Sequence, residues 1–405
     1  MNKKLGLAVA GAVMAFGASA ANAAITIPAG DWTIDIGGNV NAYYTHTKVS
    51  GDLDTGAENK TNTVQTGLLP SALGIGGKTR QNDLDIAFQF TFFTGSDSGS
   101  GTSLGNNSLN IRQAYLTFGD KSWGTIKAGR DLGIFASDAI LSDMTLLGVG
   151  VGSSTLGRIG SGYMYADWVG QISYVSPNWN GFSFAAGVRE PWTNGSDTTK
   201  KDMGFEGKVS YEWTGDYAGK IWLGGISQKH QSGTTAASAT LNADGTVTLN
   251  PASDFDGYTS RGWDIGGKVS VAGFGLVGYY YDGKGLSGST TTLAGGTALI
   301  PNGALFFSNV GKSDDKGGYV QATYVIPGVG TKLGASYGVS KSDPASGQGV
   351  AEFENKSWIV GAYHPLTKSL NLVAEYTDNK LENMGYVANQ DGKAKTVSLG
   401  AILFF

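Results

Sequence analysis

Residues 203–213, MGFEGKVSYEW, set out the pattern that decides the fold. One parity of this stretch is apolar and the other is polar: Phe205, Val209, Tyr211 and Trp213 oppose Glu206, Lys208, Ser210 and Glu212. Successive side chains of a β-strand point to opposite faces, so the stretch predicts a strand with one oily face and one wet face. Residues 261–271, RGWDIGGKVSV, repeat the pattern.

Similar runs recur along the chain and are separated alternately by short and long polar links. The seven short links lie near 81–83, 119–123, 177–180, 215–217, 271–273, 327–330 and 365–368, and the eight long links lie near 48–71, 95–106, 132–162, 192–202, 232–258, 285–316, 342–351 and 381–394. Fifteen links predict sixteen strands. A soluble sandwich has no reason to place every long link at one end. Short periplasmic turns, long outer loops and an even strand count are typical of an outer-membrane β-barrel.

Such a barrel has to close on itself. No segment after the N-terminal region has 18 or more consecutive apolar residues, so the sequence predicts no transmembrane helix. In hydrocarbon each unpaired backbone group costs several kcal/mol, which rules out an open sheet edge. We therefore expect an all-β, 16-stranded antiparallel transmembrane β-barrel in which the strand at 32–47 pairs with the strand at 395–405.

The N-terminal residues predict export. Lys3 and Lys4 precede an apolar run that ends at the small residues 21–23, the pattern of a signal peptide over 1–23. The barrel domain is then expected at 24–405, with 27 Lys and Arg against 33 Asp and Glu, a net charge of −6. This mild acidity argues against nucleic acid as a partner. The chain has no Cys, which excludes disulfides, Cys-based zinc sites and thiol nucleophiles.

Aromatic residues gather near the predicted strand ends, where the girdles of a membrane barrel lie: Tyr43, Tyr44, Trp168, Trp179, Trp213, Tyr279 and Phe405. For any one of them, ordinary core packing is an equally good explanation. Phe405 closes the alternating stretch KTVSLGAILFF, with Val397, Leu399 and Leu403 on the same face. A terminal aromatic of this kind is what outer-membrane proteins present to the barrel-assembly machinery, so we expect Phe405 to act as an assembly signal.

The link at 132–162 is unusual because it is long and yet rich in large apolar residues: Ile134, Phe135, Ile140, Leu141, Met144, Leu146 and Leu147. An exposed outer loop has no use for this much apolar surface. We therefore expect the link to pack inside the barrel. It also carries two acidic residues, Asp138 and Asp143.

Two cations are predicted on the wall that faces this link. Strict alternation places Arg112 with Asn110 and Ala114, opposite Leu109, Ile111 and Tyr115, and places Lys127 opposite Ile126 and Ala128. Acidic residues on the loop and basic residues on the wall would set a transverse field that screens solutes by charge. We predict a pore constriction made by Asp138, Asp143, Arg112 and Lys127. Loop capping or solvation is the alternative role for the two Asp residues.

The strands alone predict no ion preference. At lumen-facing positions six cations (Arg112, Lys127, Arg189, Lys208, Lys268, Lys332) balance six anions (Asp35, Asp85, Glu206, Glu212, Asp264, Glu375). The constriction then decides which ions pass.

The hairpin SLNIRQAYLTFGDKSWGTIKAGRDLGIF at 108–135, together with KTRQNDLD at 78–85 and Phe405, resembles the Gram-negative general porin family. The resemblance implies a homotrimer of sixteen-stranded barrels in which the third outer loop folds inward and narrows each pore. It suggests that Arg130, which has the opposite parity to Lys127, joins a subunit contact; an ordinary exposed Arg is the alternative.

The sequence also departs from the family pattern. Porins of this type often carry cations on the first and second strands, where this chain has Asn39 and Ala72. The basic side of the predicted constriction is therefore weaker than the resemblance implies.

Motifs for other activities fail on inspection. GFGLVG at 273–278 has the spacing of a dinucleotide-binding loop but opens a strand, not a helix. GGKT at 76–79 lacks the first Gly of a phosphate-binding loop. His46, His230 and His364 are far apart in the chain, whereas a hydrolytic site needs a base beside its nucleophile. We predict no enzyme activity, no catalytic residue, no cofactor and no metal.

The predicted function is passive diffusion of small hydrophilic solutes and ions through the cell outer membrane. The expected partners are outer-membrane lipid and lipopolysaccharide, two further copies of the chain, and the barrel-assembly machinery. Two alternatives stay open. A substrate-selective channel, for instance for organic acids, would show saturating uptake, and a structural or adhesin barrel would pass almost no current.

Overall fold

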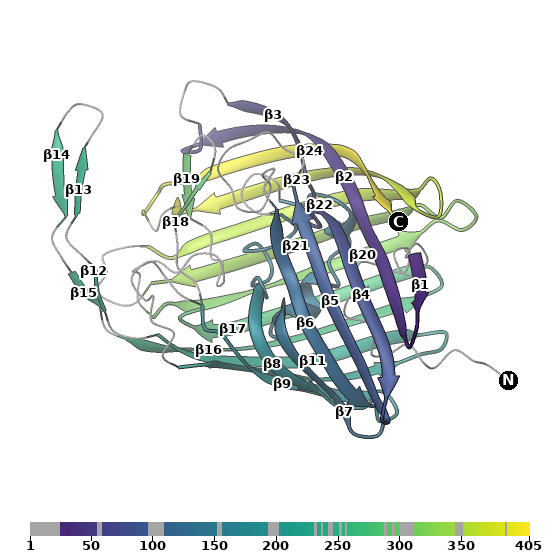
Figure 1. The fold of residues 1–405 in the computed structure, drawn as a ribbon. Helices are drawn as coiled ribbons and strands as arrows, with labels where there is room; N and C mark the ends of the chain where they lie inside the picture. The colour runs from purple at the N-terminus through teal and green to yellow at the C-terminus, as the bar shows by residue number, and fades with distance from the viewer. Residues whose placement is uncertain are drawn as a thin grey trace.

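The computed structural model describes residues 25–54, 59–95, 109–151, 156–192, 202–230, 233–235, 238–241, 246–250, 253–255, 257–286, 290–293, 296–299, 312–344, 351–384 and 387–405. The signal peptide predicted at 1–23 lies outside these residues. Most of the described chain forms one antiparallel sheet that curls into a barrel (Figure 1). No helix in the described part is long and apolar enough to cross a membrane.

Sixteen strands make up the barrel wall. In chain order they are β2 (Trp32–Gly51), β4 (Ser71–Gln81), β5 (Leu84–Thr94), β6 (Asn110–Asp120), β7 (Gly124–Leu132), β8 (Trp168–Val175), β9 (Phe182–Arg189), β10 (Gly204–Trp213), β11 (Ala218–His230), β16 (Tyr258–Val271), β17 (Phe274–Lys284), β20 (Asp314–Val325), β21 (Lys332–Asp343), β22 (Phe353–Pro365), β23 (Leu370–Glu382) and β24 (Gly392–Phe404). The links between them alternate between short and long, as predicted.

The ring closes between its first and last strands. β2 pairs with β24 from Asn39 opposite Phe404 to Gly51 opposite Gly392. One residue further along, the Gly38 N–H donates to the Phe405 carbonyl (2.9 Å) and the Phe405 N–H donates to the Gly38 carbonyl (3.1 Å). This pairing satisfies the backbone N–H and C=O groups of the first and last strands, which would otherwise have no hydrogen-bond partner in the hydrocarbon of the membrane. The predicted closed barrel of sixteen antiparallel strands is confirmed.

Smaller strands extend this wall or decorate its outer links. β1 (Ile25–Ala29) and β3 (Lys60–Gln65) pair with the two ends of β2, where β24 and β4 do not reach. Three hairpins lie in long links: β12 (Gly233–Thr235) with β15 (Ser253–Phe255), β13 (Ser238–Leu241) with β14 (Val247–Asn250), and β18 (Thr290–Leu293) with β19 (Gly296–Leu299). All three hairpins lie at one end of the barrel, and the short turns lie at the other (Figure 1).

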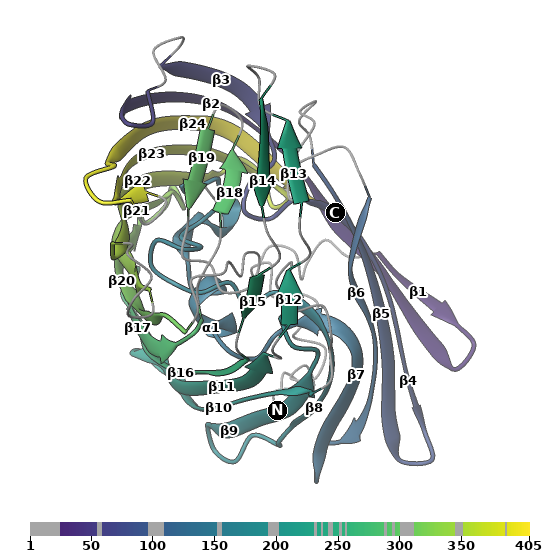
Figure 2. The same cartoon turned by 90° about the vertical axis from the view of Figure 1, so that its left-hand side faces the viewer.

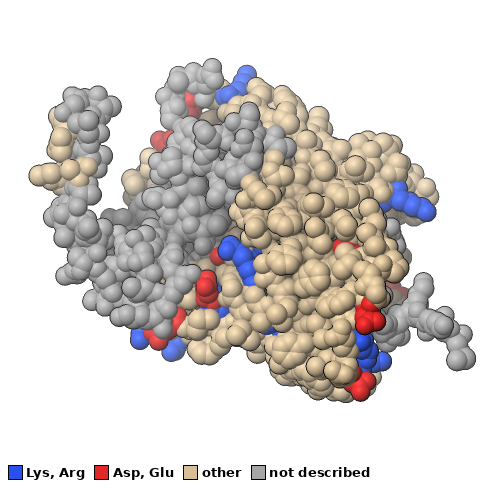
Figure 3. Space-filling view, in the orientation of Figure 1, with Lys and Arg blue, Asp and Glu red and all other residues tan. Residues whose placement is uncertain are grey.

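The two faces of the wall differ as the alternation predicts. In β10, Phe205 and Val209 are exposed on the outside, whereas Glu206 and Ser210 are buried on the inside. The barrel surface in Figure 3 is correspondingly poor in charged side chains, most of which lie toward its ends. An apolar outer band between polar ends is the surface that a bilayer requires of a membrane barrel.

The long link after β7 runs inside the ring, as expected from its apolar residues. Residues 133–151 and 156–167, here called the inner loop, include α1 (Ser137–Ile140) and the 3₁₀ helix η3 (Met144–Leu147). Looking along the barrel, α1 lies within the ring of strands (Figure 2). The buried apolar cluster forms where the inner loop meets the wall: Phe135, Ile140, Ile159 and Tyr163 pack with Trp222, Tyr279, Tyr281 and Tyr319.

Candidate functional site: the lumen cavity

Three carboxylates of the wall hold the backbone of the inner loop. The bonds run from Ile134 N to Glu206 Oε1 (2.8 Å), from Phe135 N to Glu206 Oε2 (3.2 Å), from Ala136 N to Asp264 Oδ2 (3.0 Å), and from both Val149 N and Gly150 N to Glu375 Oε2 (2.8 Å each). Hydrogen bonds from N–H groups to carboxylates are roughly twice as strong as neutral ones. Three of the six lumen-facing anions counted from the sequence, Glu206, Asp264 and Glu375, therefore bind the backbone of the inner loop.

Asp138 fastens α1 to the wall through two lysines. Its Oδ2 accepts from Lys208 Nζ at 2.6 Å and its Oδ1 from Lys220 Nζ at 2.5 Å, and the residue is 8% exposed. Burial alone would raise the pKa of Asp138, but the charges of Lys208 and Lys220 lower it by more, so this pKa lies well below its ordinary range. Asp138 is therefore ionised and bound to the wall.

Asp143 has the contacts of a structural cap. Its Oδ1 accepts the Thr145 N–H (2.9 Å) at the start of η3, and its Oδ2 accepts the Tyr163 hydroxyl (2.7 Å). It is 3% exposed. Capping of this kind satisfies a backbone donor that the helix itself leaves unpaired. These contacts correspond to loop capping, which the sequence left open as the alternative to a role in the constriction.

Arg158 also fastens the inner loop to the wall, and the sequence pattern did not reveal this contact. It is fully buried in the inner loop, and its Nε (2.8 Å) and Nη2 (2.6 Å) donate to Ser336 Oγ while Nη1 donates to Ser357 Oγ (2.9 Å). A Cβ on Gly338 would lie 2.7 Å from Arg158 Nη1 and 2.3 Å from the Ser161 carbonyl oxygen, so only Gly fits at this position of the wall. The available signal lies on the lumen-facing side of β21, where every second residue from 334 to 342 is small: Gly334, Ser336, Gly338, Ser340 and Ser342.

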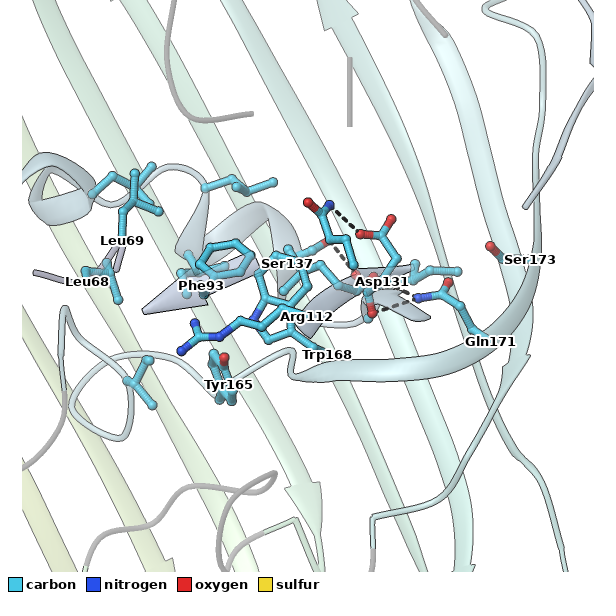
Figure 4. Close-up of a pocket in the computed structure, with 18 of the residues that line it drawn as sticks. Leu68, Leu69, Phe93, Arg112, Asp131, Ser137, Tyr165, Trp168, Gln171 and Ser173 are labelled. Carbon is cyan, nitrogen blue, oxygen red and sulfur yellow. Dashed lines mark hydrogen bonds between the residues drawn. The ribbon is translucent and has the colours of Figure 1, made fainter. Parts of the chain in front are cut away.

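Space remains between the inner loop and the wall strands β5 to β10, and we call it the lumen cavity. Its volume is about 290 Å³ (Figure 4). The loop side is apolar and is formed by Ile134, Ile140, Leu141, Leu146, Leu156 and Ile159. The charged residues that line it are Arg112, Lys127, Lys208 and Asp131. Neither Asp138 nor Asp143 borders this cavity.

The segment 66–70 folds inward and completes the lining with Leu68, Leu69 and Pro70. Asn41 holds it: its Oδ1 accepts Thr66 Oγ1 and Gly67 N (3.0 Å each), and its Nδ2 donates to the Leu69 carbonyl (2.7 Å). The sequence pattern placed these residues in an outer link at 48–71. The apolar Leu-Leu-Pro triplet, next to a wall strand, is the signal that distinguishes them from the rest of that link.

The wall side of the lumen cavity carries a chain of hydrogen bonds. Gln89 Nε2 donates to Thr91 Oγ1 (3.0 Å), Thr91 Oγ1 donates to Gln113 Oε1 (2.6 Å), and Gln113 Nε2 donates to Asp131 Oδ1 (2.9 Å). Lys127 forms an ion pair with the other oxygen of Asp131 and lies over the ring of Tyr115. Lys127 therefore faces the lumen, as predicted, but its charge is balanced locally by Asp131.

Arg112 enters the lumen cavity through a β-bulge. The pairing of β6 with β5 shifts from Gln113 opposite Thr91 to Ile111 opposite Phe92, so Arg112 is the extra residue. A bulge of this kind re-aims the side chains on either side of it. Ile111 is exposed on the outside, whereas Arg112, Gln113 and Tyr115 are buried. The prediction that Tyr115 shares the outward parity is wrong, because strict alternation takes no account of the bulge.

The remaining predicted residues lie away from the cavity. Arg130 is exposed on β7, on the parity opposite to Lys127. Phe405 closes the ring against Gly38, as described above. Asn39 is buried and accepts a hydrogen bond from Asn41 Nδ2 (2.8 Å), and Ala72 lies opposite it on β4. No cation therefore lies at either of these two positions.

A closed barrel with an apolar outer band and a loop that narrows its lumen defines a channel of the outer-membrane β-barrel class. The chain belongs to the Gram-negative porin family, which matches residues 8–383. It is an outer-membrane porin, a channel for diffusion of small hydrophilic solutes and ions. A comparison with curated proteins found no significant match.

Solved structures show the same fold at low sequence identity. The outer membrane channel DcaP of Acinetobacter baumannii is 16% identical, with a TM-score of 0.64, and the match covers 93% of this chain and 99% of that one. OmpT of Vibrio cholerae is 15% identical (TM-score 0.58; 94% of this chain and 100% of that one). OmpF of Salmonella typhi, in complex with daunomycin, is 17% identical (TM-score 0.58; 94% and 100%).

Proposed function

We propose that the lumen cavity is the selectivity filter of this porin. The observation that carries the proposal is the position of the inner loop, which is bonded to the wall from β10 round to β23 and leaves this cavity along β5 to β10. Transport through it is passive, with no catalytic step and no cofactor. Solutes are selected by size and by the charges that line the cavity.

The lining charges favour anions. Three cations and one carboxylate border the lumen cavity, a net charge of +2. Walls of low dielectric constant concentrate the field of such charges in a narrow channel. Asp138 contributes indirectly in this proposal, because it compensates Lys208, and Asp143 contributes by shaping the loop.

The reversal potential of purified channels in a planar bilayer, under a KCl gradient, tests this assignment. We expect measurable conductance with a modest preference for chloride. Arg112→Gln should move the reversal potential toward cations, and most clearly at low salt, where screening is weakest. Arg261→Gln, which removes an exposed Arg from β16, is the control and should have no effect. Equal potentials for the wild type and Arg112→Gln would place the filter elsewhere.

We further infer that the functional unit is a homotrimer in outer-membrane lipid, with lipopolysaccharide around it and Arg130 at a subunit contact. A solved form of V. cholerae OmpT, 16% identical to this chain, is described as a trimer. Residues 1–23 act in this proposal as a cleaved signal peptide, which leaves 24–405 as the barrel domain. Native mass spectrometry of the membrane-extracted protein tests both points, since it reports the subunit number and the mass of the mature chain.

A substrate-selective channel is the second candidate. It is favoured by the apolar lining of the lumen cavity, which a filter for water and simple ions does not need. Saturation of transport by one class of solute would distinguish it from simple diffusion.

A further inference from the structure

Arg112 differs from the other buried arginines of the described chain. Arg158 donates to two serines, and Arg189 pairs with Glu206 (3.4 Å). Arg112 is 6% exposed, and its only described contact is the face of Phe93, 4.9 Å from the ring centroid. Within the described residues it has no carboxylate in ion-pair range.

Asp167 is close enough to interact with Arg112 through space, but no ion pair joins them. The Asp167 carboxylate accepts the N–H of Trp168 (2.7 Å). Burial raises the pKa of Asp167, against the opposing charges of Arg189, Arg130 and Arg112, and this weakens it as a counter-ion. The guanidinium of Arg112 therefore lacks a strong partner in a largely desolvated place, which is costly unless an anion binds there.

The side chains around Arg112 are suited to contact the apolar part of a bound solute. Figure 4 shows its side chain running between Phe93 and Trp168, with Tyr165 near its tip, and the Phe93 and Trp168 ring centroids are 5.6 Å apart. The inner loop presents leucine and isoleucine side chains across the lumen cavity. An inorganic ion gains little from such a surface, whereas an apolar group gains about 25 cal/mol for each Å² of surface removed from water.

The cavity also limits the size and charge of a solute. About 290 Å³ lies at the lower end of the range for small-molecule pockets, roughly 300 to 1,000 Å³. The other two lining cations already have carboxylate partners, Lys127 with Asp131 and Lys208 with Asp138. One unpaired cation therefore favours a solute with one negative group over a dicarboxylate.

We propose that the lumen cavity contains a weak binding site for small apolar monocarboxylates of the benzoate type, in which Arg112 binds the carboxylate and the apolar lining packs against the ring. The site rests on the proposed function, because it lies in the proposed filter. A planar guanidinium suits two parallel hydrogen bonds to a carboxylate. Binding has to stay weak, because a solute that is held tightly does not leave the channel.

The experiment uses purified channels in planar bilayers and begins with KCl conductance. Sodium benzoate, sodium acetate, sodium phthalate and benzyl alcohol are then added separately. For the wild type we expect benzoate to reduce the KCl current, with half-saturation in the millimolar range. Acetate (no ring), phthalate (two charges) and benzyl alcohol (no charge) should each bind about tenfold more weakly or not at all. This solute series needs no variant, so it decides the question even if a substitution prevents folding.

Variants then assign the site to Arg112. Arg112→Gln should weaken benzoate binding by about tenfold or more, as expected for loss of hydrogen bonds to a charged group. Arg112→Lys should restore part of it, and Arg261→Gln should leave it unchanged. Conducting wild-type channels without saturable benzoate binding would overturn this inference alone. Absence of KCl conductance would instead overturn the proposed function. Equal benzoate binding by the wild type and Arg112→Gln would overturn the inferred role of Arg112 in binding the carboxylate and would leave the proposed function standing.

Discussion

Replacing Asp138 with Asn removes the one carboxylate that holds both Lys208 and Lys220 against α1. The three side chains are 10%, 22% and 17% exposed, so solvent screens the pairs only in part. Removing one partner of a buried ion pair costs about 3 to 5 kcal/mol, because the remaining charges lose their compensation. We take the lower end, since Lys208 also borders the lumen cavity. About 3 kcal/mol corresponds to roughly a hundredfold increase in the fraction of time that α1 is detached.

Single-channel recording measures both consequences of this substitution. Asp138→Asn should show more frequent brief closures than the wild type, because the loop moves in the lumen, and its reversal potential should shift toward anions. Asp83→Asn removes the same charge from a fully exposed side chain at a short turn and serves as the control. Wild-type noise together with a wild-type reversal potential in Asp138→Asn would refute the anchoring role.

The pH dependence of the same anchor has a definite sign. The folded-state pKa of Asp138 is lowered, so its stabilising contribution is present above the ordinary Asp range and is lost only as the pH falls through the lowered value. Lowering the pH from 7 to about 5 should therefore leave unchanged the difference in closure frequency between the wild type and Asp138→Asn, as measured by single-channel recording.

Three further predictions concern assembly, topology and packing. Phe405→Lys should prevent membrane insertion without preventing export, because it places a charge where the ring closes, and normal amounts of heat-modifiable inserted protein would contradict this. A cysteine at Leu249 should react with an impermeant thiol reagent on whole cells, whereas one at Val329, exposed at a short turn, should not; labelling of both would mean an error in strand count between them. Gly338→Leu should displace Arg158 and loosen the inner loop in an inserted barrel, and protease resistance of that loop equal to the wild type would argue against the contact.

The barrel was predictable because each element of the argument is local or follows from the membrane. Alternation along 203–213 and the rhythm of short and long links count the strands, and the lack of water in the bilayer requires closure. The apolar residues of 132–162 likewise indicate an inward loop. None of these signals depends on knowing which side chains meet.

The chemistry of the filter was harder to predict for a physical reason. A charged side chain at a lumen-facing position can either face water or bind the inner loop. The alternation of the sequence does not distinguish these two cases. Glu375 counts as a lumen anion in the sequence, yet it accepts two backbone N–H groups of the inner loop. The β-bulge at Arg112 has no local sequence signature comparable to that of a turn. The side of the wall on which Tyr115 lies was therefore predicted wrongly. Partners far apart in the chain decide these cases.

The attachments of the inner loop have a consequence for the order of folding. Ile134 bonds to a residue 72 positions later in the chain, Ala136 to one 128 positions later, and Val149 to one 226 positions later. Contacts with such long sequence separation form late, because the intervening chain has to be ordered first. The narrow part of the channel is therefore expected to take its final form only as the last strands join the wall. A chain stalled before β23 would therefore lack the bonds from Val149 and Gly150 to Glu375, and its inner loop would not be fully fastened across the lumen.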